Sequence, residues 1–190
     1  DTGCTYTIPN GSNLTNLSGG SFSASQFVLR GQLIIPAGSV VDLTGDVELS
    51  GPGGLFSGPG GTTDAFTTLE TVNANGVLTV SNNRSLTLDA PTVNVEGGMN
   101  VGSQAAPGAT ITVNNNLTVN GTLGLQNGTL TVGGAFNMNG TLTGNGSING
   151  NAVNNGVLAP GNSPGEITIA GDYTQGDDGS VRIQIESLVA

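Results

Sequence analysis

Two acidic segments are the parts of this chain whose residue types and spacing come nearest to a chemical site. One contains Asp42, Asp46 and Glu48, and the other runs from residue 172 to residue 178. Carboxylate oxygens are preferred ligands of Ca²⁺, and a pair of carboxylates can hydrolyse a glycosidic bond. Neither segment has the spacing of an EF-hand loop or of a Gly-Gly-x-Gly-x-Asp calcium repeat. We therefore interpret both as solvated acids in turns, and we predict no metal ligands and no cofactor.

The chain lacks the side chains that acid–base and nucleophilic catalysis use most often. It contains no His, and its three basic residues are Arg30, Arg84 and Arg182. This composition excludes a Ser–His pair, a His general base and a conventional zinc site. Ser163, in the segment PGNSPG, has no Lys or His to activate it. We predict no catalytic residues and no enzymatic activity.

The formal net charge of −10 at pH 7 argues against polyanionic partners. Proteins that bind nucleic acid neutralise its phosphates with Lys and Arg, and anionic membrane surfaces attract basic segments. No apolar run of about 18 residues occurs, so we expect no helix that inserts into a membrane. We predict that neither nucleic acid nor a membrane is a partner of this chain.

Three Thr-x-Thr tripeptides raise the question of a regular array of hydroxyl groups. They are Thr110–Thr112, Thr129–Thr131 and Thr141–Thr143. A flat array of this kind could organise water, as on an ice-binding surface. The tripeptides are 19 and then 12 residues apart, so we expect that they do not share one register. We interpret them as ordinary outward-facing Thr on strands.

The elements that would position these residues are short strands. Charged residues make up only 8% of the chain, Gly accounts for 33 residues, and aliphatic residues recur in short alternating runs. Such alternation is typical of strands with one buried face. We predict an all-β fold with strands at 33–35, 40–43, 47–49, 77–80, 85–88, 92–95, 110–113, 117–119, 123–125, 129–132, 166–169 and 180–185.

Several of these runs follow a repeated Asn-Gly unit. Asn-Gly often forms a hairpin turn, which would pair neighbouring strands antiparallel. Repeats of 16 to 19 residues with two or three short strands instead favour a coil of a parallel β-helix, in which coils stack about 4.8 Å apart. We predict a parallel β-helix (β-solenoid), right-handed, with Asn ladders at corners where Asn and Gly adopt positive φ. The units begin at Asn75, Asn120, Asn127, Asn139 and Asn155.

Two segments depart from this repeat. Residues 1–30 are rich in Ser and Asn, and we predict that they form an N-terminal cap or assembly segment, because an open sheet edge recruits other strands. Residues 31–190 then form the solenoid. Within them a duplicated SGPGG sequence flanks Leu55 and Phe56, which predicts a Gly/Pro-rich loop insertion near residues 50–63.

The first residues and the sequons bear on the cellular compartment. Cys4 is the single cysteine and cannot form an internal disulfide, so it either pairs with another chain or is buried as a small residue. Asn-x-Ser/Thr sequons, such as those at Asn120 and Asn139, accept glycans only in a secretory route that carries this modification. The opening Asp-Thr-Gly-Cys has no basic segment, so we expect a mature chain from which a signal peptide has been removed.

The last quarter of the chain carries a characteristic series of motifs. These are Gly-Asn-Gly at 144–146, Asn-Gly at 155–156, PGNSPG at 160–165, Gly-Asp-Tyr-Thr-Gln at 171–175 and an alternating strand at 181–185. The series resembles the β-helix repeats in passenger domains of bacterial autotransporters and related large secreted surface proteins. The resemblance implies a β-helix outside the cell, but such passengers serve as adhesins, scaffolds and carriers of enzymes alike. They end in a membrane β-barrel, so we expect this chain to be a released fragment or a stand-alone protein.

Together these features predict a secreted, non-catalytic structural protein at the cell surface. The strand at 180–188 lacks an obvious cap, and such an edge is a template for the next subunit. We therefore expect the chain itself as the partner, in an extracellular filament built by end-to-end stacking. The alternative is a monomeric adhesin that binds surface glycans or host surfaces. A polysaccharide-active β-helix enzyme is the least favoured interpretation, because residues 97–165 contain no acid or base.

Overall fold

The structure is a computed structural model and consists of strands joined by short turns. It describes in full residues 71–72, 77–81, 85–103, 108–161 and 165–184. Between residues 5 and 66 it describes the backbone of eight short strands. No helix occurs among these residues, and hence none that has the length and apolar character of a membrane span.

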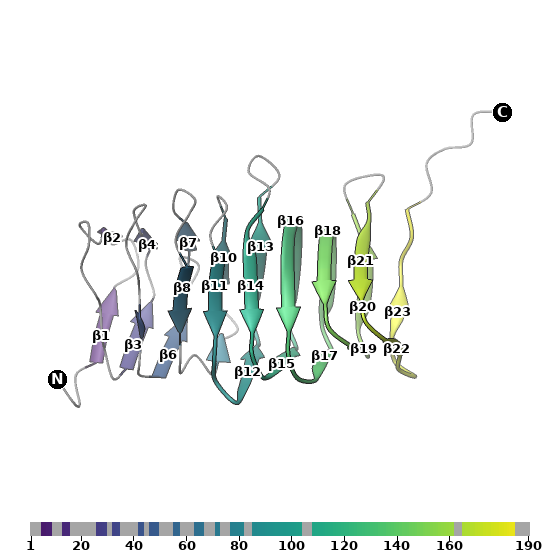
Figure 1. The fold of residues 1–190 in the computed structure, drawn as a ribbon, viewed down its shortest axis with the longest axis horizontal. Coiled ribbons are helices and arrows are strands. Elements are labelled where there is room, and N and C mark those ends of the chain that lie inside the picture. Colours follow the sequence, from purple (N-terminus) through teal and green to yellow (C-terminus); the bar gives the residue numbers. More distant parts are fainter. Residues whose placement is uncertain are drawn as a thin grey trace.

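Each coil of the fully described part contributes a strand segment to each of three faces (Figure 1). The first such coil consists of β10 (Val77–Val80), β11 (Ser85–Leu88) and β12 (Thr92–Val95). The remaining strands of the fully described part are β9 (Thr71–Val72), β13 (Gly98–Gly102), β14 (Thr110–Val113), β15 (Asn116–Val119), β16 (Thr122–Val132), β17 (Phe136–Met138), β18 (Thr141–Asn149), β19 (Ala152–Asn154), β20 (Val157–Pro160), β21 (Ile167–Ala170), β22 (Tyr173–Gln175) and β23 (Ser180–Val181). The long strands β16 and β18 each cross two faces, because their two halves pair with different neighbours.

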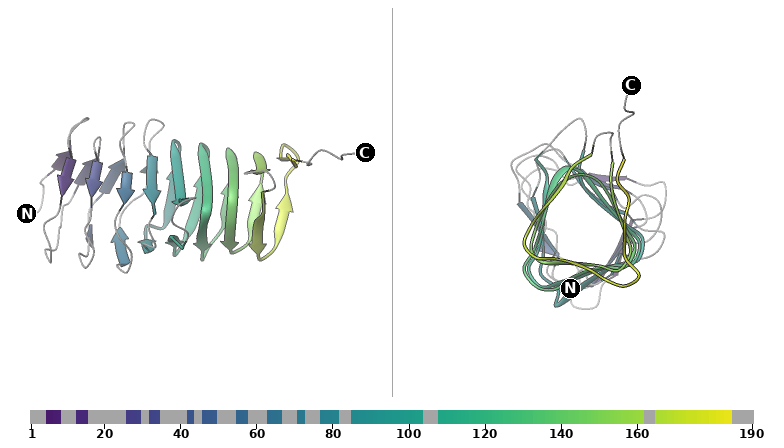
Figure 2. Two further views of the ribbon diagram at one scale, coloured as in Figure 1. Left: turned by 90° about the horizontal axis from the view of Figure 1, so that it is seen from above. Right: turned by 90° about the vertical axis from the view of Figure 1, so that its right-hand side faces the viewer.

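The described strand pairings are all parallel, so each strand lies beside its counterpart in the preceding coil (Figure 2). One sheet has nine strands in the order β1-β3-β6-β9-β12-β15-β17-β19-β22, and the other sheet forms the remaining two faces. The fully described part makes about five turns. The N-terminal strands that continue both sheets are β1 (Thr5–Ile8), β2 (Asn13–Thr15), β3 (Gln26–Leu29), β4 (Gln32–Ile34), β5 (Asp42–Leu43), β6 (Asp46–Leu49), β7 (Leu55–Ser57) and β8 (Thr63–Phe66).

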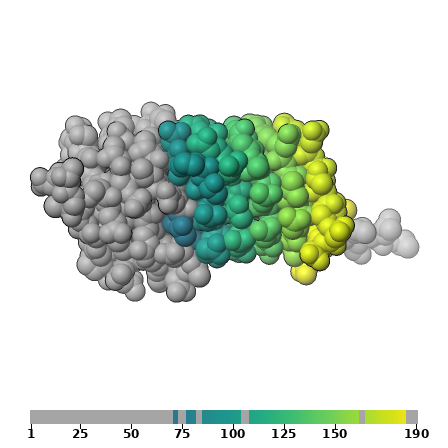
Figure 3. Space-filling view, turned by 90° about the horizontal axis from the view of Figure 1, so that it is seen from below, coloured from purple at the N-terminus to yellow at the C-terminus, as the bar shows by residue number. Residues whose placement is uncertain are grey.

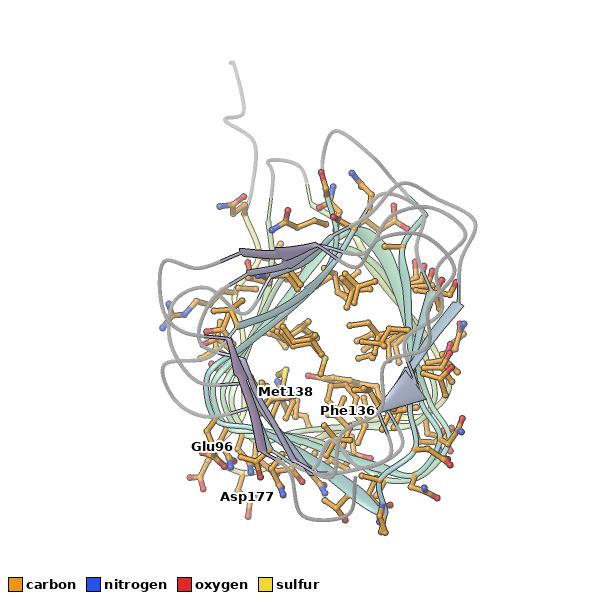
Figure 4. The ribbon with its side chains drawn as sticks, turned by 90° about the vertical axis from the view of Figure 1, so that its left-hand side faces the viewer. Glu96, Phe136, Met138 and Asp177 are labelled. Carbon is orange, nitrogen blue, oxygen red and sulfur yellow. The ribbon has the colours of Figure 1, made fainter. Side chains whose placement is uncertain are left out.

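The core consists of columns of apolar side chains inside the coils. In β10, β11 and β12, half-exposed and buried residues alternate, as expected of strands with one face on the core. One inward column runs from Leu78 through the equivalent residues of each coil to Leu158. Figure 4 shows Phe136 and Met138 directed into the same interior. Burying a side chain of this size contributes about 1.5–3 kcal/mol, so these columns hold the coils together.

The predicted all-β parallel solenoid is confirmed, and the hairpin alternative is wrong because the described strands pair in parallel. The predicted strands at 77–80, 85–88, 92–95 and 110–113 agree residue for residue with β10, β11, β12 and β14. The predicted strands at 123–125 and 129–132 are two parts of β16. The predicted strands do not include β9, β13, β17, β18, β19, β20 and β22, most of which have few alternating aliphatic residues. The predicted strand at 180–185 is too long, because β23 ends at Val181.

Several predictions concern residues that the structure describes only in part. In the segment 1–30, the backbones of β1, β2 and β3 pair within the two sheets, while the rest of the predicted cap, with Cys4, lies outside the described residues. In the predicted insertion near 50–63, Leu55–Ser57 form β7, which pairs with β4 and β10. Both SGPGG copies lie mostly outside the described residues. The domain boundaries and the right-handed sense of the coil stay predictions.

Candidate functional site: the corner ladder and the C-terminal edge

The acidic segments do not come together into a site. Asp172, Asp177 and Asp178 are exposed in turns of the last described coil. Asp42 lies in β5 and Asp46 in β6, and these strands belong to different sheets. Throughout the described ranges, no three His, Cys, Asp or Glu side chains are grouped so that they could hold a metal ion. Ser163 of the PGNSPG segment lies outside the residues that the structure describes.

One corner of the solenoid is tied together by a row of side chains, which we name the corner ladder: Glu96, Asn120, Asn139 and Asn155. Asn120 Nδ2 donates to Glu96 Oε1 at 2.7 Å, and Asn139 Nδ2 donates to Asn120 Oδ1 at 2.8 Å. Asn155 Nδ2 donates to Asn139 Oδ1 at 3.2 Å. Each amide thus donates to the preceding coil, and the row ends on a carboxylate, which is a strong acceptor. Figure 4 shows Glu96 at this corner.

The glycine that follows each Asn of the corner ladder allows the coils to approach closely. A Cβ added at Gly121 would lie 1.9 Å from the carbonyl oxygen of Gly97. A Cβ at Gly140 would lie 1.9 Å from the oxygen of Gly121, and one at Gly156 would lie 2.0 Å from that of Gly140. The glycines therefore form a column of their own, in which each backbone occupies the space that a side chain of its neighbour would need.

The predicted reason for these glycines is wrong. None of the three has a positive φ, so this corner does not depend on the left-handed region. Asn127 does have a positive φ of 60°, but it lies at a different corner, between the two halves of β16. Asn120, Asn139 and Asn155 are thus copies of one corner and Asn127 is not, while Asn75 lies outside the described residues.

Replacing Asn139 by Ala is expected to reduce the free energy of unfolding by about 1 kcal/mol. The substitution removes two hydrogen bonds of the corner ladder, each of modest net value at an exposed site. Asn137→Ala is the matched control, since Asn137 lies outward in the same coil; its effect should stay within about 0.5 kcal/mol. Urea unfolding of the three proteins measures both values. Equal effects of the two substitutions would show that the ladder contributes nothing measurable.

The prediction that the Thr-x-Thr tripeptides do not share one register is wrong for two of the three. Thr110 pairs with Thr129 and Thr112 pairs with Thr131, so these tripeptides lie in one register on one face. Only Thr141–Thr143 lies on a different face, beside the first half of β16. Residues 97–161 contain no charged residue, so the described coils of this region present uncharged faces rich in Thr and Asn. Figure 3 shows these coils stacked along the solenoid.

A polar layer follows the apolar core at the C-terminal end of the solenoid. It consists of Asn154, Tyr173 and Gln175, at positions where earlier coils have apolar residues such as Met138. Asn154 is only 1% exposed. Its Nδ2 donates to the Tyr173 hydroxyl at 3.0 Å and to Gln175 Oε1 at 3.2 Å. These bonds compensate for the burial of the amide, as buried polar groups require.

Three described strands at this end, β21, β22 and β23, each have a partner on one side only; we name β22 and β23 the C-terminal edge. Asp172 and Gly176 flank β22, and their backbones form hydrogen bonds with the preceding coil. Backbone groups of successive residues in a strand point to alternate sides. Tyr173 and Gln175 therefore direct their N–H and C=O groups away from the solenoid.

The same alternation holds in β23. Ser180 N donates to Gly156 O at 2.7 Å, and Arg182 N donates to Leu158 O at 2.8 Å. The backbone groups of Val181 and Ile183 consequently point outward from the end. Their side chains are also uncovered, because Val181 is 46% and Ile183 is 75% exposed. Among the described residues no strand pairs with these outward groups, so the C-terminal edge combines unpaired main-chain hydrogen-bonding groups with an incomplete apolar layer.

Searches against protein-family models, curated proteins and solved structures returned no match for this chain. The fold alone defines its class, which is the all-β parallel β-solenoids. Folds of this class serve many unrelated functions, so any assignment has to rest on particular surfaces. In the described residues those surfaces are the uncharged faces and the C-terminal edge.

Proposed function

We propose that this chain is a non-catalytic extracellular structural subunit that assembles end to end into a filament or matrix. The observation that carries the proposal is that both ends of the described solenoid are open. At one end β21, β22 and β23, and at the other β1, β2 and β5, have a described strand partner on one side only. Because the pairings are parallel, a second copy displaced along the axis brings β1 onto β22 and β2 onto β23.

Strand addition of this kind would use the outward main-chain groups and the exposed apolar side chains of the C-terminal edge. Its outward N–H and C=O groups would form main-chain hydrogen bonds with the incoming strands, as in other cases of β-augmentation. Its exposed apolar side chains would continue the core into the next copy. Natural proteins often block open edges with charges or Pro. Arg182 is the one charged residue of the segment 180–183, and the flanking Val181 and Ile183 are apolar. Secretion to the cell surface, which the resemblance to passenger repeats suggests, belongs to the same proposal.

Electron microscopy of the purified chain over a range of concentrations tests this function. The expected result is filaments one solenoid wide, whose mean length increases with protein concentration. Single rods that stay dispersed at the highest concentration would overturn the proposal.

The double substitution Val181→Lys with Ile183→Lys is expected to abolish filaments and leave folded monomers. Two ammonium groups would have to be buried in the junction, and Lys on an edge strand is a common barrier to strand addition. The matched control places the same two charges two residues apart at outward positions of a middle coil, in Thr110→Lys with Thr112→Lys, and should still assemble. Sedimentation velocity measures the outcome. Assembly of the edge variant at the wild-type level would show that this edge is not the interface.

A second function is favoured by the uncharged faces. Rows of outward Ser and Thr, such as the paired Thr110–Thr112 and Thr129–Thr131, suit an uncharged partner rich in hydroxyl groups, and we propose surface glycans for a monomeric adhesin. Glycan-array binding by the non-assembling Val181→Lys, Ile183→Lys variant separates the two functions. Specific binding by this monomer supports the adhesin, and its absence together with wild-type filaments supports the structural subunit.

A further inference from the structure

We infer that the end-to-end junction has a fixed register in which Tyr173 of one copy stacks on Tyr6 of the next. This inference rests on the proposed assembly and adds to it the residues that meet. It follows from the columns of paired residues that run along the solenoid. Because each column continues from coil to coil without interruption, its first and last members are the residues that a second copy would bring together.

One column can be followed through all nine strands of its sheet. Thr7 in β1 and Thr174 in β22 are its two ends, and every step between them is a parallel pair. Tyr6 directly precedes Thr7, and Tyr173 directly precedes Thr174, so both tyrosines occupy the same position in the coil. They are the only two tyrosines of the chain. The sequence thus places one at each end of a single column.

The neighbouring face gives the same register. A second column runs from Leu14 in β2 to Pro160 in β20 through paired residues of each coil. Leu158 pairs with Val181, and the bond from Arg182 N to Leu158 O continues this pairing, so Ile183 takes the next place in the column. A second copy in the inferred register therefore sets Leu14 onto Ile183, which is the most exposed large apolar residue of the edge.

These contacts are chemically matched. Stacked aromatic residues on adjacent strands stabilise a pairing, and Tyr173 is 39% exposed until a second copy covers it. Leu14 on Ile183 extends an aliphatic column. In the first sheet, Thr7 meets Thr174, a pair that can form a hydroxyl–hydroxyl hydrogen bond. A displacement by one residue would turn every one of these side chains to the opposite face, so the register is strongly specified.

Oxidative cross-linking of tyrosines tests the register. A light-activated ruthenium complex with persulfate joins tyrosine rings that are in contact, and it is applied to the assembled protein. Within one chain the tyrosines are separated by eight strand spacings, roughly 38 Å, so a link must join two copies. The expected result is a series of denaturant-resistant multimers whose peptide maps contain the Tyr6–Tyr173 link.

Two variants sharpen the test. Tyr6→Phe and Tyr173→Phe each leave one tyrosine per chain, so either protein alone should give filaments but no multimers. An equal mixture of the two should give cross-linked dimers and nothing larger. Filaments without this link, or with Tyr173–Tyr173 links, would overturn the register while leaving assembly intact. Absence of filaments in every sample would instead overturn the proposed function, and the register with it.

Discussion

Gly140→Ala should destabilise the solenoid by about 3 kcal/mol, the upper end of the usual cost of overpacking. A Cβ at this position would lie 1.9 Å from the carbonyl oxygen of Gly121 and 2.4 Å from that of Asn120. Both atoms belong to the backbone of the preceding coil, so no side-chain rotation relieves the clash. The coils would have to separate locally, which also breaks the corner ladder between Asn139 and Asn120.

Gly98→Ala is the matched control for this prediction. An added Cβ at Gly98 meets only the Val77 side chain, at 3.4 Å, and Gly98 has no positive φ. Its effect on the free energy of unfolding should be less than about 1 kcal/mol. Urea titrations followed by far-ultraviolet circular dichroism measure both substitutions. A loss of similar size for the two would mean that backbone approach is not why Gly occupies this corner.

Phe136→Ala is expected to cost about 3–5 kcal/mol, the largest effect of any side-chain truncation in the described core. Phe136 is 1% exposed and is the largest of the fully buried side chains. It pairs with Leu117 in one neighbouring coil and with Ala152 in the other, and the small Ala152 cannot fill the space that truncation would leave.

Two further substitutions make this prediction specific. Phe136→Leu retains most of the apolar volume and should cost clearly less than Phe136→Ala. Thr118→Ala, at an outward position of β15, should change the free energy of unfolding by no more than about 0.5 kcal/mol. Thermal and urea unfolding give the order. If Phe136→Ala were no worse than Thr118→Ala, the interior of the coil could not be packed as described.

The sequence predicts the fold of this chain better than the register of its coils. Regular alternation in 77–80 and 85–88 is sufficient to locate β10 and β11. Strand β13 is not indicated because only Met99 and Val101 of its five residues are large and apolar. Register is harder because coil length varies: the corner residues Glu96, Asn120, Asn139 and Asn155 are 24, 19 and then 16 residues apart. The tripeptides at Thr110 and Thr129 are one coil of 19 residues apart, whereas the one at Thr141 lies on another face, so judging all three by one spacing gives the wrong register.

The candidate site is predicted only in outline. The Asn ladder and the start of the final strand at Ser180 are indicated by the sequence. Glu96 as the last acceptor of the ladder is not, because no Asn marks it. The following Gly97 is the signal that identifies this corner, since it takes the place of Gly121 and Gly140. The polar layer is also missed: Tyr173 and Gln175 belong to a recognised motif, but only the folded coil brings them to Asn154.

The parallel stacking of the coils has a mechanical consequence. The described coils touch their neighbours only along the axis, so tension that pulls the chain away from one end loads a single row of hydrogen bonds and one layer of the core at a time. The coils would then unfold one after another at low force, and they would not shear apart together. A coil of 19 residues would release roughly 60–70 Å of extended chain, so a filament made of this protein would stretch in small steps and absorb work before it broke.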